Sequence, residues 1–128
     1  MANTVEITRD NFEDTVKQGT VVLDFWATWC GPCRAFAPVF DRVAAKHPDV
    51  TFGKVNTEEQ RELAAEFQIN AIPTLMVIRD GVLIFNRAGM VPQGALEDIV
   101  AQVQGLDMDE VRQKIADAES KPQAAAAN

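Results

Sequence analysis

Residues that ligate metals or form disulfides are scarce in this sequence, which has two cysteines, one histidine and no tyrosine among 128 residues. A structural zinc site takes four ligands, usually from two paired motifs. Cys30, Cys33 and His47 are too few for an intramolecular zinc site, although two copies of the chain could supply two cysteine pairs. A disulfide that closes so small a loop contributes only about 2 kcal/mol, and a reducing compartment would keep it open. We therefore expect no bound metal and no purely structural disulfide.

Basic residues are also fewer than acidic ones: the chain has 12 lysines and arginines and 19 aspartates and glutamates, which give a formal net charge of -7. Such a chain repels phosphate backbones and anionic lipids unless a basic patch overrides the repulsion, and the sequence contains no such patch. Residues 1–7 lack the basic start and apolar run of a secretory signal, and no run approaches the ~20 apolar residues of a membrane span. We expect a cytoplasmic protein, monomeric, with no nucleic-acid or membrane partner.

Strand and helix patterns alternate along the chain, which is typical of layered α/β domains. Asp80 and Gly81 form a two-residue hairpin signal, and Pro38 predicts a kink inside the second helix. The expected strands are residues 5–7, 21–27, 50–55, 74–78 and 82–85. The expected helices are residues 8–19, 33–46, 58–67 and a fourth around 96–103 that is closed by Gly105.

The last part of the chain reads as an addition to this domain. We expect residues 1–105 to form the domain, 106–120 a helical extension and 121–128, which end in four alanines, a disordered tail. Asp107 and Glu110 have the spacing of a capping box at the start of the extra helix. Its narrow apolar stripe consists of Met108, Val111, Ile115 and Ala118.

The chemistry of the chain is predicted at its two cysteines, which lie one helical turn apart and can switch between dithiol and disulfide. With Cys30 at the first position of the helix, the free N–H groups and the dipole favour its thiolate, while Cys33 is shielded one turn inside. Cys30 would then attack and Cys33 resolve. Pro32 fits a first helical turn, and Gly31 lets a partner's backbone approach. Burial of both thiols as inert core residues is disfavoured, because Gly and Pro between them indicate an element boundary.

Two charged residues in strands leave alternatives open. Asp24 interrupts an apolar strand; a strand covered on both faces would raise its pKa and suit it to general-base work on Cys33, whereas an edge-facing Asp24 would be solvated. Lys54 is either a buried partner of Asp24 or a surface lysine at the sheet edge. Pro73 precedes a strand and is consistent with an ordinary trans proline, since only about one X-Pro bond in twenty is cis.

The run Trp29-Cys30-Gly31-Pro32-Cys33 resembles the active-site motif of the thioredoxin family. The resemblance spans about residues 5–105, and the whole ordered set is far more specific than a Cys-x-x-Cys pair alone. Its other members, in order, are Asp24-Phe25-Trp26-Ala27, Pro38, Lys54, Ile72-Pro73-Thr74, Asp80-Gly81 and Gly89.

The resemblance implies a thioredoxin fold, with a central mixed sheet of five strands and four flanking helices, to which this chain adds a short C-terminal helix. It implies a cis Pro73 opposite the cysteines, with Cys30 as nucleophile and Cys33 as resolving thiol. It also makes Asp24 the buried carboxylate that assists Cys33, with Lys54 as its neighbour.

The same resemblance implies a shallow apolar rim where an extended peptide docks against the free backbone of Ile72. The residues of this rim are Trp29, Gly31, Pro32, Ile72, Pro73 and Gly89. Met90 is bulkier than the rim pattern calls for and could change substrate choice.

The activity implied is reduction of disulfides in target proteins by dithiol–disulfide exchange, which maintains cytoplasmic redox homeostasis. The Gly-Pro pair between the cysteines resembles the reducing members of the family. The partners implied are disulfide-containing proteins and a thioredoxin reductase that uses FAD and NADPH, while this chain needs no cofactor of its own. The alternative is a holdase that binds clients through the apolar rim and the C-terminal helix.

Overall fold

The computed structural model describes residues 3–120, which form five strands and five helices. The strands are β1 (Thr4–Glu6), β2 (Thr20–Trp26), β3 (Thr51–Asn56), β4 (Thr74–Arg79) and β5 (Val82–Ala88). The helices are α1 (Arg9–Val16), α2 (Gly31–Lys46), α3 (Arg61–Glu66), α4 (Gln93–Gln104) and α5 (Met108–Ser120). None of the helices within residues 3–120 is long and apolar enough to cross a bilayer. The tail expected to be disordered, 121–128, lies outside the described residues.

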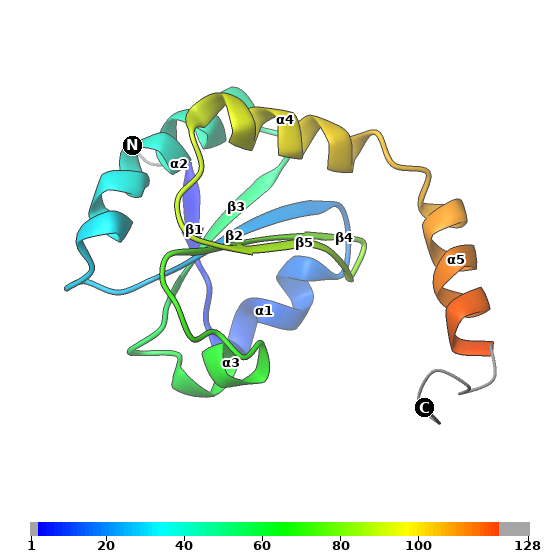
Figure 1. The fold of residues 1–128 in the computed structure, drawn as a ribbon, viewed down its shortest axis with the longest axis horizontal. Coiled ribbons are helices and arrows are strands. Elements are labelled where there is room, and N and C mark those ends of the chain that lie inside the picture. The colour runs from blue at the N-terminus through cyan, green and yellow to red at the C-terminus, as the bar shows by residue number, and fades with distance from the viewer. Residues whose placement is uncertain (1–2, 121–128) are drawn as a thin grey trace, which may run out of the picture.

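The strands form one mixed sheet in the order β1-β3-β2-β4-β5, which confirms the expected sheet (Figure 1). β2 is the central strand: it is parallel to β3 on one side and antiparallel to β4 on the other. β4 and β5 are joined through Asp80 and Gly81, whose φ angles of 51° and 79° are both positive. This is the conformation that a two-residue hairpin turn requires, and glycine adopts it without a side-chain clash.

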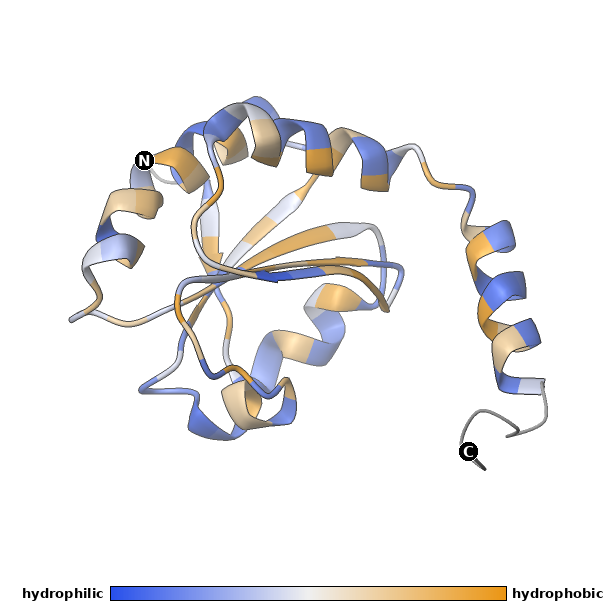
Figure 2. Cartoon of the chain, viewed as in Figure 1, coloured by the Kyte–Doolittle hydropathy of each residue, from blue (hydrophilic) through white to orange (hydrophobic). Residues whose placement is uncertain are grey.

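Each face of the sheet is covered by two helices, as Figure 1 shows, and alternate residues of β2 pack into the two resulting cores. Val22 packs against the core beneath α2 and α4, whereas Val21 and Leu23 pack against the core over α1 and α3. In Figure 2 apolar residues occur both in the strands and as stripes along the helices. Because both faces are covered, β2 is buried over almost its whole length, which is the environment its apolar sequence predicts.

Most predicted boundaries differ from the structure, by one to three residues. Helix α2 begins at Gly31, one residue after the first helical position expected for Cys30 and two residues before the apolar pattern that starts at Cys33. Helix α3 begins at Arg61 rather than Glu58, because the Asn56 side chain accepts the backbone N–H groups of Glu58 and Glu59 and forms a turn there. Strand β5 continues to Ala88, since an edge strand needs no apolar residues on its exposed side to complete its ladder.

The additional helix α5 is present, and its base is fixed to the domain. The Arg79 guanidinium donates to the carbonyl oxygens of Val103 and Gln104 at the end of α4, at 2.8 and 2.9 Å, and to that of Leu106 in the turn before α5, at 2.8 Å. Asp107 caps α5 by accepting the N–H groups of Asp109 and Glu110. The Glu110 side chain pairs with Lys114 rather than returning to Asp107 as a capping box would require. In Figure 1, α5 projects from the end of the molecule opposite the start of α2.

We predict that Gly53→Ala destabilises the fold, because a Cβ at Gly53 would lie 2.5 Å from Ile7 Cγ1 and 3.0 Å from Leu23 Cδ2. Both neighbours are fully buried, so the overpacking costs about 1–3 kcal/mol. Gly94→Ala in α4 is the matched control, since a Cβ there meets nothing within 4 Å. Urea unfolding of the oxidised protein should show a loss only for Gly53→Ala. Equal stability of the two variants would contradict the packing argument.

Candidate active site

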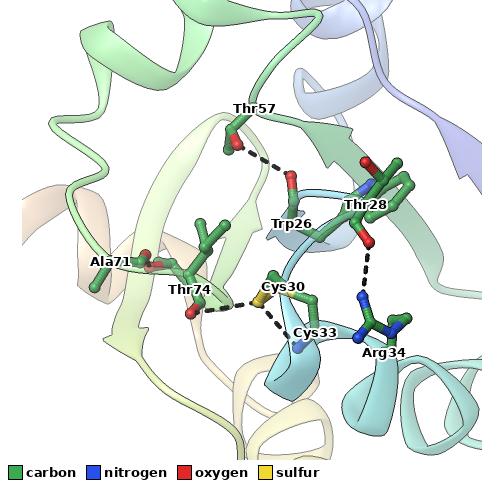
Figure 3. Close-up of a disulfide and its surroundings, with 9 residues drawn as sticks. Trp26, Thr28, Cys30, Cys33, Arg34, Thr57, Ala71 and Thr74 are labelled. Atoms are coloured by element: carbon green, nitrogen blue, oxygen red, sulfur yellow. Dashed lines mark hydrogen bonds between the residues drawn. A yellow bond between two sulfur atoms is a disulfide. The ribbon is translucent and has the colours of Figure 1, made fainter.

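The two cysteines form a disulfide at the point where β2 gives way to α2, with Cα atoms 5.2 Å apart (Figure 3). Cys30 is the N-cap of α2, one position further out than expected, and the backbone N–H of Cys33 donates to Cys30 Sγ at 3.1 Å. Pro32 lies in the first turn, where its missing N–H leaves no intrahelical bond unmade. A reduced Cys30 sulfur at this position faces the free N–H groups and positive dipole end of α2, both of which stabilise a thiolate.

The expected difference in shielding between the two cysteines is absent in the disulfide form. Cys30 is 3% exposed and Cys33 is 2% exposed. What separates them is their position on α2, because Cys30 caps the helix and Cys33 lies in its first turn. In this form solvent access does not distinguish the two cysteines, whereas their position relative to the end of α2 does.

Asp24 is fully buried, and neither of its carboxylate oxygens has a hydrogen-bond partner among the described residues. Burial raises the pKa of Asp24 from 3.8 to about 7, because it removes water from the charged form; Lys54 acts against this shift and Asp41 adds to it. Of the two environments that the sequence left open, the buried one is correct. A carboxyl group with this pKa can exchange a proton near neutral pH.

Lys54 lies directly beside Asp24, its register partner across the parallel pair of β2 and β3. Its ammonium group is 5.2 Å from the centre of the Trp26 ring, and within residues 3–120 no ion pair within 4 Å joins it to Asp24. Lys54 is half-buried, so it combines features of the two alternatives: a neighbour of Asp24 whose side chain is partly exposed.

The residues expected to form the substrate rim lie around the disulfide. Ile72 O is 3.8 Å from Cys30 Sγ, and the Ile72–Pro73 peptide bond is cis, as the resemblance implied. Gly89, at the end of β5, donates its N–H to Pro73 O at 2.7 Å, which brings a third segment to the same place. Trp29 is 64% exposed, so most of its indole ring is open to solvent. Gly31 and Pro32 are exposed as well.

A shallow hollow of about 210 Å³ adjoins this rim and includes residues that the sequence pattern did not single out. It is lined by Trp29, Thr57, Ile69, Asn70, Ala71 and Ile72. Thr57 is held there by two hydrogen bonds to Trp26 O, one from its backbone N–H and one from its hydroxyl (Figure 3). The only sequence signal for Thr57 was its place after β3, since the carboxyl ends of neighbouring parallel strands meet at one sheet edge.

The redox group of this site is the chain's own disulfide. Residues 3–120 hold no cluster of three or more histidine, cysteine, aspartate or glutamate side chains of the kind that binds a metal ion. The arrangement can transfer two electrons by thiol–disulfide exchange, with a helix terminus to stabilise a thiolate and a buried carboxyl group to move a proton.

Comparison with known proteins gives the same family from sequence and from structure. Residues 3–102 match the family model described as Thioredoxin. The chain is 49% identical to "Putative thioredoxin 2" of Streptomyces coelicolor over 122 residues, which are 94% of this chain and 91% of that protein. It is 40% identical to "Thioredoxin 1" of Synechococcus elongatus over 99 residues, 75% of this chain and 92% of that protein.

Among solved structures, a mutant thioredoxin from Halobacterium salinarum superimposes with a TM-score of 0.76 at 26% identity. The match covers 83% of this chain and 96% of that one. A matching family model over most of the chain, close relatives and a redox-active cysteine pair at the start of α2 agree with one another. The chain belongs to the thioredoxin family of dithiol–disulfide oxidoreductases.

Proposed function

We propose that this chain works as a protein disulfide reductase in which Cys30 is the attacking thiol and Cys33 the resolving thiol. The observation that supports this assignment best is the hydrogen bond from the Cys33 N–H to Cys30 Sγ at the N-cap of α2. The same N–H can stabilise a Cys30 thiolate in the reduced protein, whereas Cys33 has no comparable place at the helix end.

The reaction proceeds by two exchanges that balance in electrons. In the first, the Cys30 thiolate attacks one sulfur of a target disulfide, and the other target sulfur leaves as a thiolate. In the second, the Cys33 thiolate attacks Cys30 Sγ of the mixed disulfide and forms the Cys30–Cys33 bond, while the second target thiolate leaves. Two electrons pass from this chain to the target.

Asp24 serves as the general base for the second exchange. Cys33 must lose its proton before it can attack, and the Asp24 carboxylate accepts that proton directly or through one water. Two features support this role: the absence of any hydrogen-bond partner for its oxygens among the described residues and a pKa raised to about 7 by burial. Lys54 moderates the proton affinity of Asp24 from the neighbouring strand.

A target peptide docks in extended form across the rim. The support is the geometry of Ile72, which lies outside the strands and whose N–H and C=O have no backbone hydrogen-bond partner within residues 3–120. These free groups can pair with a peptide strand. Trp29 and Met90 offer apolar contact on either side, since they are 64% and 42% exposed. Gly31, Pro32 and Gly89 add no long side chain to the surface between them, and Pro73 is buried.

The oxidised chain is returned to the dithiol by a thioredoxin reductase that draws on NADPH through FAD, and the protein acts as an electron carrier in the cytoplasm. Family membership supports this assignment of partner and compartment. No feature of the described residues favours the holdase alternative, because the rim residues surround the disulfide itself.

We predict that Cys30→Ser abolishes reduction of insulin by this protein, because no thiol remains that can start the exchange. Cys33→Ser should still attack but should accumulate as a covalent mixed disulfide with the insulin chain. Non-reducing electrophoresis and mass spectrometry detect that adduct. A stable adduct on Cys33 of the Cys30→Ser variant, with none on Cys30 of the Cys33→Ser variant, would reverse the assigned roles.

We predict that Asp24→Asn slows the second exchange most near neutral pH. In the unmodified protein the rate should rise as pH increases through about 7, where Asp24 becomes a base. At high pH hydroxide deprotonates Cys33 without help, so the two proteins should converge. Rapid-quench measurement of mixed-disulfide decay tests this, with the exposed Asp98→Asn as control. A constant ratio of rates at every pH would remove Asp24 from the proton transfer.

The same substitution should change how stability depends on pH. The pKa of Asp24 is about 7 in the folded protein against 3.8 for the ordinary group, so the stability that its protonated form provides is lost as pH rises through 7. Asparagine cannot ionise. The gain in unfolding free energy of Asp24→Asn over the unmodified protein should therefore grow by about 3 kcal/mol between pH 4.5 and 8.5. Urea unfolding at both pH values measures it, and a pH-independent difference would show that burial does not perturb Asp24.

A further inference from the structure

Three charged side chains form a row across the parallel part of the sheet. Lys54 on β3 has Asp24 of β2 as its register partner on one side and Glu6 of β1 on the other. Register partners on adjacent strands project from the same face of a sheet, about 4.8 Å apart. The two acidic residues therefore flank the lysine at equal spacing, with Asp24 at the buried centre and Glu6 at the edge.

Glu6 and Lys54, the two outer residues of this row, line a cleft. The cleft has a volume of about 270 Å³ and is lined by Thr4, Val5, Glu6, Trp26, Lys54 and Asn56. Glu6 is exposed and Lys54 is half-buried, whereas Asp24 is fully buried. A flexible lysine side chain at such a place can direct its ammonium group inward to Asp24 or outward to the mouth of the cleft.

The structure shows the ammonium group in neither ion pair. It lies over the Trp26 ring, and residues 3–120 contain no ion pair within 4 Å that involves Lys54. Asp24 keeps both oxygens without a hydrogen-bond partner among these residues, although a cation is its neighbour. A buried carboxyl group with an unshared cation beside it would be expected to attract that cation.

The other charged group that acts on Asp24 is Asp41, which comes from α2 above the same face of the sheet. It is partly buried, and its Oδ1 has no hydrogen-bond partner in the described part of the chain. On the remaining side of Asp24, the register partner on β4 is the apolar Leu75. Among residues 3–120, Lys54 is thus the only cation that acts on Asp24, and its position decides how strongly the charged form of Asp24 is stabilised.

We propose that Glu6 is a positioning residue for the active site: its carboxylate competes with Asp24 for the Lys54 ammonium group and keeps that group at the mouth of the cleft. This inference deepens the proposed function, because it rests on Asp24 as the base for Cys33. Removal of the Glu6 charge should let Lys54 turn inward. The Asp24 carboxylate then gains a stabilising cation, so its proton affinity falls and it becomes a weaker base.

The first experiment follows Asp24 itself, by titrating its carboxyl carbon with NMR in the oxidised protein. Glu6→Gln should lower the Asp24 midpoint by about half a pH unit, the size expected for a cation that moves closer through a partly solvated cleft. Glu62→Gln is the matched control, because it removes the same charge from an exposed site on α3, which covers the opposite face. An unmoved midpoint in Glu6→Gln, or an equal shift in Glu62→Gln, overturns the inference.

A second arm tests the route through Lys54. In a Lys54→Gln background, Glu6→Gln should shift the Asp24 midpoint much less than it does in the unmodified protein, because the responding cation is gone. The same shift in both backgrounds would show that Glu6 acts directly on Asp24 and would overturn the positioning role.

The kinetic profile separates this inference from the proposed function. The pH at which mixed-disulfide decay accelerates should move down with the NMR midpoint in Glu6→Gln. If the NMR midpoint of Asp24 moves while the pH profile of mixed-disulfide decay does not, Asp24 is not the base for Cys33. That result contradicts the proposed function and the catalytic part of this inference. If the NMR midpoint does not move, only the role of Glu6 is contradicted. The role of Asp24 is then decided by the Asp24→Asn experiment.

Discussion

The site depends on the complete burial of the central strand β2. Because the sheet has helices on both faces, β2 has no solvated side, and every residue it carries is fixed by neighbours. The strand ends at Trp26, and four residues later Cys30 caps α2. One buried element therefore sets both the place of the sulfur at the helix end and the dry environment of Asp24.

Burial of Asp24 opposes folding, and the proposed role of Asp24 as a base accounts for this unfavourable placement. An apolar residue at this position would suit the core beneath α2 better than a carboxyl group without hydrogen-bond partners among the described residues. Such a departure from the rules of core packing is expected at functional sites, where local rules give way to chemistry. Lys54 offsets part of the cost from the adjacent strand, but a close ion pair would hold Asp24 in its charged form and remove its usefulness as a base near neutral pH.

Much of this architecture could be predicted from local sequence patterns. The apolar run of β2, the Asp80-Gly81 turn and the cysteine pair at a helix start are confirmed, because short-range chemistry specifies each of them. The sequence could not decide whether Asp24 is buried, because the segments that cover the two faces of β2 are distant from it in the chain. No sequence pattern predicted that Asp41 is partly buried or that Thr57 lines the hollow beside the rim. Their surroundings form only when α2, β3 and the Ile72 segment come together in the fold. The division at residue 105 stays a prediction.

The redox site and the additional helix α5 lie at opposite ends of the molecule. The disulfide lies at the carboxyl end of β2, whereas α5 projects from the opposite end, where Arg79 binds the turn that precedes it (Figure 1). The match to the Streptomyces coelicolor relative covers 94% of this chain and so reaches into α5, while the match to the Synechococcus elongatus relative covers 75%. The family model ends at residue 102, before α5 begins, so both cysteines lie in the part of the chain that matches the family and α5 lies outside it.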